Sequence, residues 1–282
     1  MGDEAGSASS SGSGSVTGRV VELWRYPVKS MLGESVDALE LGPMGVVGDR
    51  RFGLVDRVTG HLLSAKAVPE LFTARARTMG EVVSITLPDG TALTSDDPAT
   101  PAALSAWLGR PVELRESGPT DDGSSIEFEL RFDPADDSGD LVPWPTMAGS
   151  FLDSAPVHVL TTGSLRAMAE ARAESIWDVR RFRPNLLVDT GAAEGFIEDG
   201  WVGRGVALGS SGPTIRVDQA AMRCAMPLRP QASLGDRPAL ERDLGVFRAL
   251  SAEHDNHLGA YCGVASPGTV SIGDQIREVG VG

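Results

Sequence analysis

The chain has 282 residues, enough for one large domain or two ordinary ones. It carries 25 basic and 39 acidic side chains, which gives a formal net charge of −14. Nucleic acids and anionic membranes bind positively charged surfaces, so this charge argues against both as partners. Hydrophobic residues make up 41%, and the 34 glycines and 18 prolines indicate many turns and short elements rather than a helical bundle.

The first fifteen residues are mostly Gly, Ser and Ala, without the basic patch and apolar run of a secretory signal. Such a composition buries too little apolar surface to fold, so we expect a disordered tail over 1–15. No apolar run approaches the roughly 18 residues of a membrane helix. We therefore expect a cytoplasmic protein whose two cysteines, Cys224 and Cys262, stay reduced.

Short strands separated by turn residues dominate residues 16–117. The predicted strands cover 20–24, 51–56, 61–66, 82–87, 91–94 and 111–115. A turn at 57–60 is expected to join the second and third strands into a hairpin, and Pro88-Asp89-Gly90 to join the next two. A short helix is expected after Asp97-Pro98 and should end at Leu108. This spacing predicts a small β-barrel or sandwich.

Residues 118–149 mix acidic side chains with Gly, Ser and Pro. We interpret them as a flexible crossing between domains, with one candidate strand at 126–132. Residues 150–282 are expected to form the second domain, which makes the chain a β-rich α+β protein with a few helices. Its predicted strands cover 157–160, 185–188, 206–208, 214–217, 261–265 and 269–272.

Two helices are predicted in this second half. Thr162 is expected to cap a helix that carries Leu165 and Met168 on one face. Asp236 and Pro238 are expected to start another, which carries Leu240, Leu244, Phe247 and Leu250. His254 and His257 match no standard zinc spacing, and we expect them to cap the end of this helix.

Cys224 is the first candidate for chemistry. It directly follows Arg223, and a neighbouring arginine favours the thiolate, which is both the nucleophile and the metal ligand. Pro227 and Pro230 predict a rigid loop after it. A buried structural cysteine is the alternative interpretation. Cys262 lies in an apolar strand and is expected to be a small core residue.

A basic segment, Arg180 to Asn185, is the second candidate. Guanidinium groups bind phosphate or other oxyanions, although salt bridges to the surplus carboxylates would explain the same residues. Lys29-Ser30 ends a predicted strand and could hold a phosphate, but no Gly-rich loop precedes it, so it is not a P-loop. With two cysteines, the chain alone cannot bind an iron–sulfur cluster through four thiolates.

Together these motifs resemble a known family. The segments that carry the resemblance are Tyr26–Ser30, Gly48–Asp56, Arg181–Leu186, Arg223-Cys224, Leu258–Tyr261 and Pro267–Asp274. The first two resemble the N-terminal β-barrel domain of MOSC proteins, and the others resemble the MOSC domain itself. Both domains occur in the mitochondrial amidoxime-reducing component and its bacterial relatives. The resemblance implies a small β-barrel domain over 16–117 followed by a MOSC β-barrel domain over 150–282.

The resemblance also implies a molybdenum cofactor held between the two domains. Cys224 falls at the position of the catalytic thiolate that binds molybdenum. The residues at cofactor-binding positions are Lys29, Ser30, Arg50, Arg183, Asn185 and Arg223, with Ser154 near a further contact. Lys66 stands where relatives usually have arginine. Residues 225–230 depart from the pattern of the amidoxime reducers, and this loop is expected to border the substrate. Met222 replaces a small polar residue of some relatives, which removes one possible hydrogen bond.

The implied reaction is the reduction of an N-hydroxylated compound. Because no flavin or nicotinamide motif is present, a separate reductase is expected to donate the electrons. We expect a monomer. Two alternatives stay open: a carrier that holds cofactor or sulfur on Cys224, and a β-barrel binding module that uses the arginines for another anion.

Overall fold

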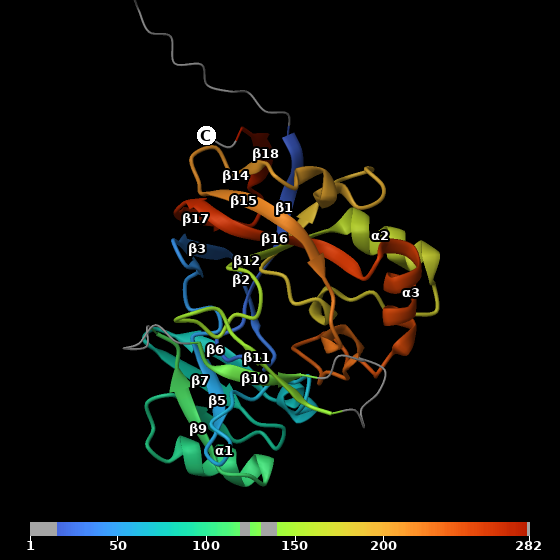
Figure 1. The fold of residues 1–282 in the computed structure, drawn as a ribbon. Helices are drawn as coiled ribbons and strands as arrows, with labels where there is room; N and C mark the ends of the chain where they lie inside the picture. Colours follow the sequence, from blue (N-terminus) through green and yellow to red (C-terminus); the bar gives the residue numbers. More distant parts are fainter. Residues whose placement is uncertain (1–15, 119–124, 131–139, 281–282) are drawn as a thin grey trace, which may run out of the picture.

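The computed structural model describes residues 16–118, 125–130 and 140–280 (Figure 1). The tail over 1–15 and nearly half of the predicted crossing segment, 119–124 and 131–139, lie outside these residues. The described residues form two lobes, each built mainly of strands. The predicted β-rich α+β fold with few helices is confirmed.

The larger lobe is a closed sheet. Its strands are β1 (Val16–Arg25), β12 (Val157–Thr161), β13 (Leu186–Asp189), β14 (Gly205–Leu208), β15 (Thr214–Met222), β16 (His257–Ser266) and β18 (Gln275–Val279). They lie in the order β13-β12-β16-β15-β14-β18-β1, and β1 also pairs with β13, which closes the sheet into a barrel. The barrel interior is filled by aliphatic side chains such as Val20, Leu23 and Ile276, all fully buried.

The described N-terminal strands up to residue 46 belong to the same lobe as the C-terminal strands. β2 (Glu34–Val36) pairs with β1, while β3 (Ala38–Gly42) lies between β4 (Gly45–Val46) and β17 (Gly268–Ser271). Leu39 and Leu41 of β3 belong to the same buried core as the barrel strands. The sheet therefore crosses the predicted domain limit at 117, and the domain limits stay predictions.

The smaller lobe consists of short sheets around a separate core. Its elements are β5 (Phe52–Asp56), η1 (Pro69–Thr73), β6 (Arg75–Met79), β7 (Val82–Thr86), β8 (Ala92–Thr94), α1 (Thr100–Leu108) and β9 (Val112–Glu116). The β7–β8 hairpin around Pro88-Asp89-Gly90 and the helix that ends at Leu108 were predicted, and both are confirmed.

The predicted hairpin between 51–56 and 61–66 forms only in part: the chain turns back after Asp56 as expected, but 61–66 is not a strand. β5 pairs with β9 along its whole length, and the 61–66 segment contributes only an isolated bridge from Leu62 to Val55. Residues 62–66 are all buried, whereas a strand with one exposed face would alternate. This segment instead runs inward and brings Lys66 to the boundary between the lobes.

A further small sheet packs against the smaller lobe. β10 (Glu127–Leu130) falls within the predicted strand 126–132 and pairs with β11 (Val142–Pro145) in a hairpin. Phe128 of β10 is buried against Leu62 and Phe151. The hairpin therefore lies against the smaller lobe, close to the segment that leads into β12.

Two helices lie beside each other at one side of the barrel: α2 (Thr162–Ala171) and α3 (Leu244–His254) (Figure 1). The remaining short helices are η2 (Val179–Arg181), η3 (Ile197–Trp201) and η4 (Met226–Leu228). They cover the outer face of the barrel with a core that includes Phe182, Leu187 and Leu250.

Both predicted helix starts are displaced. The hydroxyl of Thr161, rather than that of Thr162, accepts a hydrogen bond from the Ser164 amide and caps α2. α3 begins at Leu244, with Asp243 as its cap, and not near Asp236. Asp243 is the cap because its carboxylate accepts a hydrogen bond from the Gly245 amide. The earlier Leu240 pairs with Gln231 in an extended bridge, so the helix does not begin there.

Candidate functional site

A cavity of about 150 Å³ lies where the two lobes meet. All eight residues singled out from the sequence line it: Lys29, Ser30, Arg50, Ser154, Arg183, Asn185, Arg223 and Cys224. Lys66, Asp153, His158 and Tyr261 line it as well. Segments that are far apart in the chain thus converge on one place, although their individual roles stay predictions.

Loops at the ends of strands supply most of these side chains. Lys29 and Ser30 follow β1, Arg183 precedes β13, and Cys224 lies between β15 and η4. Ser30, Arg50 and Arg183 have φ values of 66°, 46° and 55°. Residues with side chains rarely adopt this left-handed conformation, and strained backbone of this kind is concentrated at functional sites.

Two buried lysines share one carboxylate in the cavity. The Lys29 ammonium contacts Asp153 and donates to the Phe151 carbonyl at 2.8 Å, and Lys66 donates to Asp153 at 2.8 Å. Their Nζ atoms lie 4.7 and 4.3 Å from the centre of the Phe128 ring. The ring of Phe128 thus attracts both ammonium groups through cation–π interactions.

These two lysines differ in their titration. Burial lowers the pKa of Lys29 to about 8, against the pull of Asp153. Burial also opposes the charge of Lys66, but Asp153 and Cys224 favour that charge more, so the pKa of Lys66 is raised. Desolvation would raise the pKa of Asp153, yet the two ammonium groups outweigh it and hold that pKa far below its usual range.

Two arginines lie over the ring of Tyr26. The guanidinium carbons of Arg50 and Arg183 are 4.5 and 4.1 Å from the ring centre. Arg50 is paired with Asp49, whereas Arg183 donates one hydrogen bond to the Met31 carbonyl at 2.8 Å. The Nη2 atom of Arg183 is buried and has no hydrogen-bond partner among the described residues. Burial and the nearby Arg50 lower the pKa of Arg183 to about 10.

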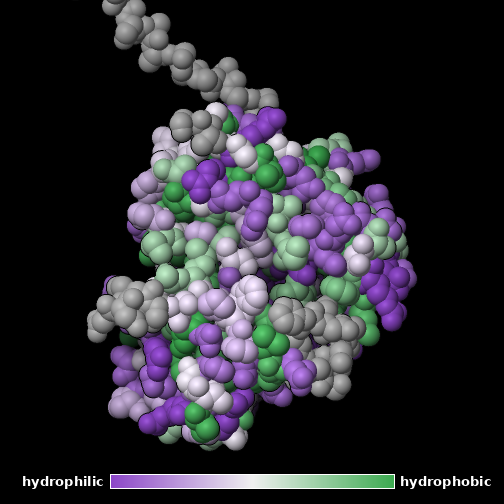
Figure 2. Space-filling model, viewed as in Figure 1, coloured by the Kyte–Doolittle hydropathy of each residue, from purple (hydrophilic) through white to green (hydrophobic). Residues whose placement is uncertain are grey.

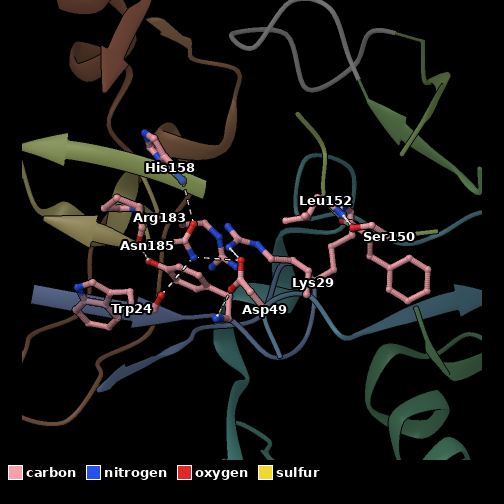
Figure 3. Close-up of polar contacts among 12 residues, drawn as sticks. Trp24, Lys29, Asp49, Ser150, Leu152, His158, Arg183 and Asn185 are labelled. Carbon is pink, nitrogen blue, oxygen red and sulfur yellow. Dashed lines mark hydrogen bonds and ion pairs between the residues drawn. The ribbon is translucent and has the colours of Figure 1, made fainter. Parts of the chain in front are cut away.

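Asn185 organises the backbone around the cavity (Figure 3). Its Oδ1 accepts from the His158 amide at 3.0 Å. Its Nδ2 donates to the Trp24 carbonyl at 3.3 Å and to Asp49 at 3.1 Å. The amide thereby ties β1, β12 and the start of β13 together and also orients the carboxylate that pairs with Arg50.

Arg223 and His158 form the wall next to Cys224. Arg223 donates to the Phe182 carbonyl at 2.9 Å, and its Nη1 lies 3.4 Å from Nε2 of His158. Burial, followed by the positive charge of Arg223, holds the pKa of His158 well below its usual value. A neutral imidazole can accept at Nε2. Gly259 makes room for the ring, because a Cβ there would lie 2.4 Å from Nε2 of His158.

The sequence left two interpretations open for the basic segment, and the structure divides its arginines between them. Arg180 forms a salt bridge with Asp178, while Arg181 is buried and donates to the carbonyls of Ile176, Pro227 and Glu241. Arg181 therefore braces the loop that follows Cys224. Of the three arginines, only Arg183 lines the cavity.

The two thiols lie in opposite environments. Cys224 is exposed at the cavity, which disagrees with the alternative of a buried structural cysteine. Cys262 is fully buried in β16, as predicted, and burial raises the pKa of its thiol. The residues that border Cys224 include Met222 and Tyr261, whose hydroxyl donates to the Met222 carbonyl at 3.3 Å.

Sequence reasoning missed three residues of this cavity. Asp153 directly precedes the predicted Ser154, and an acidic residue next to a candidate anion site is a signal that could have been used. His158 interrupts the apolar run of β12 and Tyr261 lies in the matched Leu258–Tyr261 motif. These two rings contact each other edge to face, with centroids 5.5 Å apart.

A wider cavity of about 560 Å³ adjoins the first. The two share Lys66, Asp153, Ser154, Met222, Arg223, Cys224 and Tyr261. Cys224 therefore stands at the junction between a space lined with cations and a larger space.

On the face of the molecule seen in Figure 2, apolar residues are scattered in small groups among hydrophilic ones. Within the described ranges, no helix is long and apolar enough to cross a membrane.

Comparisons with known proteins find relatives over most of the chain. Mitochondrial amidoxime reducing component 2 of Bos taurus is 26% identical over 93% of this chain and 83% of its own length. Mitochondrial amidoxime-reducing component 1 of Homo sapiens is 25% identical over similar shares, 93% and 83%. Molybdenum cofactor sulfurase of Danio rerio is 28% identical over 84% of this chain, which corresponds to 33% of the sulfurase.

Among solved structures, the YuaD protein from Bacillus subtilis aligns with a TM-score of 0.47 at 11% identity, covering 94% of this chain and 97% of that one. Family models match both halves of the chain. Residues 17–108 match the MOSC N-terminal beta barrel domain, and residues 147–277 match the MOSC domain. The chain therefore belongs to the MOSC proteins, with a MOSC N-terminal beta barrel domain ahead of its MOSC domain.

Proposed function

We propose that this protein is a molybdenum-cofactor-dependent oxidoreductase that reduces N-hydroxylated compounds, with the Cys224 thiolate as a molybdenum ligand. The observation that carries this proposal is the position of Cys224, which is exposed at the junction of a cation-lined cavity and a wider one. Relatives named as amidoxime reducing components support the reaction class.

The smaller cavity fits the anionic end of such a cofactor. Five cationic side chains line it: Lys29, Arg50, Lys66, Arg183 and Arg223. Asp153 is the one carboxylate among its described lining residues. The buried Nη2 of Arg183 lacks a partner within the described residues, and an unmet guanidinium donor favours an oxyanion at that place. We therefore assign Lys29, Ser30, Arg50, Arg183 and Arg223 to binding of the pterin phosphate and ring system.

The assignments of the remaining residues follow from their contacts. The side-chain amide of Asn185 forms hydrogen bonds with the Trp24 carbonyl, Asp49 and the His158 amide, so it holds the cavity walls in place. Ser154 lines both cavities and is assigned a cofactor contact. A thiolate is a soft ligand that suits molybdenum. When bound, the cofactor supplies a metal centre that exchanges two electrons.

The overall reaction consumes two electrons and two protons per N–O bond cleaved and releases water. A separate reductase must supply the electrons. In the cavity, Arg223 keeps positive charge beside Cys224, and neutral His158 can accept a hydrogen bond at Nε2.

We also propose that the protein is a cytoplasmic monomer. The amidoxime-reducing relatives are mitochondrial by name.

The test compares three proteins made in a host that synthesises molybdenum cofactor: the wild type, Cys224→Ser and Cys262→Ala. We expect roughly stoichiometric molybdenum in the wild type and in Cys262→Ala by elemental analysis. Cys224→Ser should retain less metal and lose reduction of amidoximes driven by a chemical reductant. Wild-type protein with neither metal nor pterin would contradict the proposal.

A second candidate is a carrier that holds sulfur on Cys224. The exposure of this thiol and the similarity to a molybdenum cofactor sulfurase favour it. A persulfide would add one sulfur atom to the mass of the peptide that contains Cys224. If incubation of cofactor-free protein with a sulfur donor and a cysteine desulfurase gives no such mass shift, this candidate is excluded.

A further inference from the structure

The wider cavity next to Cys224 has one wall made by the β10–β11 hairpin. Phe128 and Leu130 of β10 and Trp144 of β11 line it. Phe128 and Trp144 lie directly opposite each other in the antiparallel register. Side chains at opposite positions project from the same face of a hairpin, and Leu130 shares that face because it lies two residues after Phe128.

Phe128 and Trp144 differ in the exposed fraction of their side chains. Phe128 is 1% exposed and supports Lys29 and Lys66, so its ring belongs to the structure of the cationic cavity. Trp144 is 47% exposed although it lines a cavity. A large aromatic side chain that remains open to water beside a thiol offers contact area to a ligand.

Other residues that line this cavity are more polar. Gln219, Asn256 and His257 line it, and Phe247 adds a further aromatic contact. A ligand with a flat apolar body and a polar end would place its body on the hairpin. Cys224 lies on the boundary shared with the cationic cavity, so the polar end of that ligand would point toward the thiol.

We propose that the β10–β11 hairpin selects substrates that carry an aromatic ring, with Trp144 as the specificity-determining contact. This inference rests on the proposed reduction of N-hydroxylated compounds and adds the class of substrate: an aryl amidoxime or aryl hydroxylamine rather than a short alkyl analogue. Trp144 acts on binding of the ring and takes no part in N–O cleavage.

The test uses cofactor-loaded protein and two ligands that differ only in the body, benzamidoxime and acetamidoxime. Without a reductant neither is turned over, so titration calorimetry gives dissociation constants. Trp144→Ala should weaken benzamidoxime binding about tenfold, which corresponds to about 1.4 kcal/mol. The same variant should change acetamidoxime binding less than twofold. Trp144→Phe should retain most of the affinity, since a ring remains.

Leu141→Ala is the matched control. Leu141 is an exposed apolar residue immediately before β11, and it does not line the cavity. We expect it to leave both affinities unchanged. Equal effects of Trp144→Ala on the two ligands, or no effect on either, would overturn the inference.

A second arm separates this inference from the proposed function. With a chemical reductant, KM for benzamidoxime should rise about tenfold in Trp144→Ala while kcat changes little. If the wild type turns over neither ligand, the proposed function fails, whatever the binding data show. If it turns over both but Trp144→Ala leaves KM unchanged, the proposed function stands and the specificity role is wrong.

Discussion

His158 is a buried imidazole whose proton affinity is suppressed by burial and by Arg223. In the unfolded chain its pKa returns to about 6.5, so the unfolded state binds the proton more readily. Stability should therefore be lost as pH falls through about 6.5. We expect the free energy of unfolding in urea to fall between pH 7.5 and 5.5, and the fall to be smaller in His158→Gln.

Leu141→Ala provides the control for this prediction, because it removes an exposed apolar side chain and no titratable group. It should keep the wild-type slope of unfolding free energy against pH. An identical slope in wild type and His158→Gln would show that His158 does not control the acid limit of the fold.

Lys29 and Lys66 lie side by side but should respond differently to pH. Lys29, with a pKa of about 8, loses its charge as pH rises through 8, whereas the raised pKa of Lys66 keeps it charged. Sulfate has constant charge in this range. Its dissociation constant, measured by calorimetry on cofactor-free protein, should rise several-fold from pH 7 to pH 9.

Two variants separate the contributions of the lysines. Lys29→Met should weaken sulfate binding at pH 7 and abolish the pH dependence. Lys66→Met should weaken binding at both pH values and keep the dependence. The assignment is wrong if the two variants behave alike.

At the scale of elements, the cap of α2 gives the sharpest prediction. The Thr161 hydroxyl accepts from the Ser164 amide at 3.1 Å and donates to the buried carboxylate of Glu198 at 2.6 Å. Thr161→Val removes both bonds while it keeps the shape of the side chain. We expect it to lower the free energy of unfolding by about 1–2 kcal/mol in chemical denaturation.

Thr162→Val tests whether the cap has been assigned to the correct threonine. The Thr162 hydroxyl donates a hydrogen bond to Asp189, whereas the Ser164 amide at the start of α2 donates to Thr161. This variant should cost less stability than Thr161→Val. The reverse order would restore Thr162, the residue expected from the sequence, as the cap.

Elements defined by local chemistry were predictable from the sequence, and elements defined by distant partners were not. The β7–β8 hairpin follows from a turn of three residues, so its pattern is complete within one segment. The error at 61–66 arose because this segment is buried by residues that are distant in the chain, such as Phe128 and Phe151. The helix caps were misplaced by one residue at Thr162 and by seven at Asp236, because several capping side chains compete.

The candidate site shows the same division. Motifs led to Cys224, Lys29 and Arg183 because each has a distinctive neighbour in the chain. Asp153 and His158 gain their character only when other segments fold against them, as the two lysines do for Asp153. No single segment could therefore reveal the shift in their pKa values.

At the scale of the whole molecule, β1 joins the two ends of the chain. It pairs with β18 through residues such as Arg19 and Gln275, and with β13 on its other edge. A fragment over 147–282 lacks β1, so its barrel would stay open with two unpaired edges. We expect this fragment to show no cooperative thermal unfolding by circular dichroism.

Adding a peptide that covers residues 16–46 should restore cooperative unfolding, because it supplies β1 together with β2, β3 and β4. A control peptide of the same composition in scrambled order should not. If the fragment alone unfolds cooperatively, the barrel does not depend on β1 for its stability.

The position of β1 also bears on how the protein is made. Ribosomes add roughly 5–20 residues per second, so β1 emerges about 13–50 seconds before its partner β18 exists. Throughout that interval the residues of β1 that pair with β18 have no partner on that edge, which leaves them exposed to the association that unpaired edges invite. The cavity at Cys224 is walled by residues from both ends of the chain. The complete cavity can therefore form only after the ribosome has added Tyr261, more than two hundred residues after Lys29.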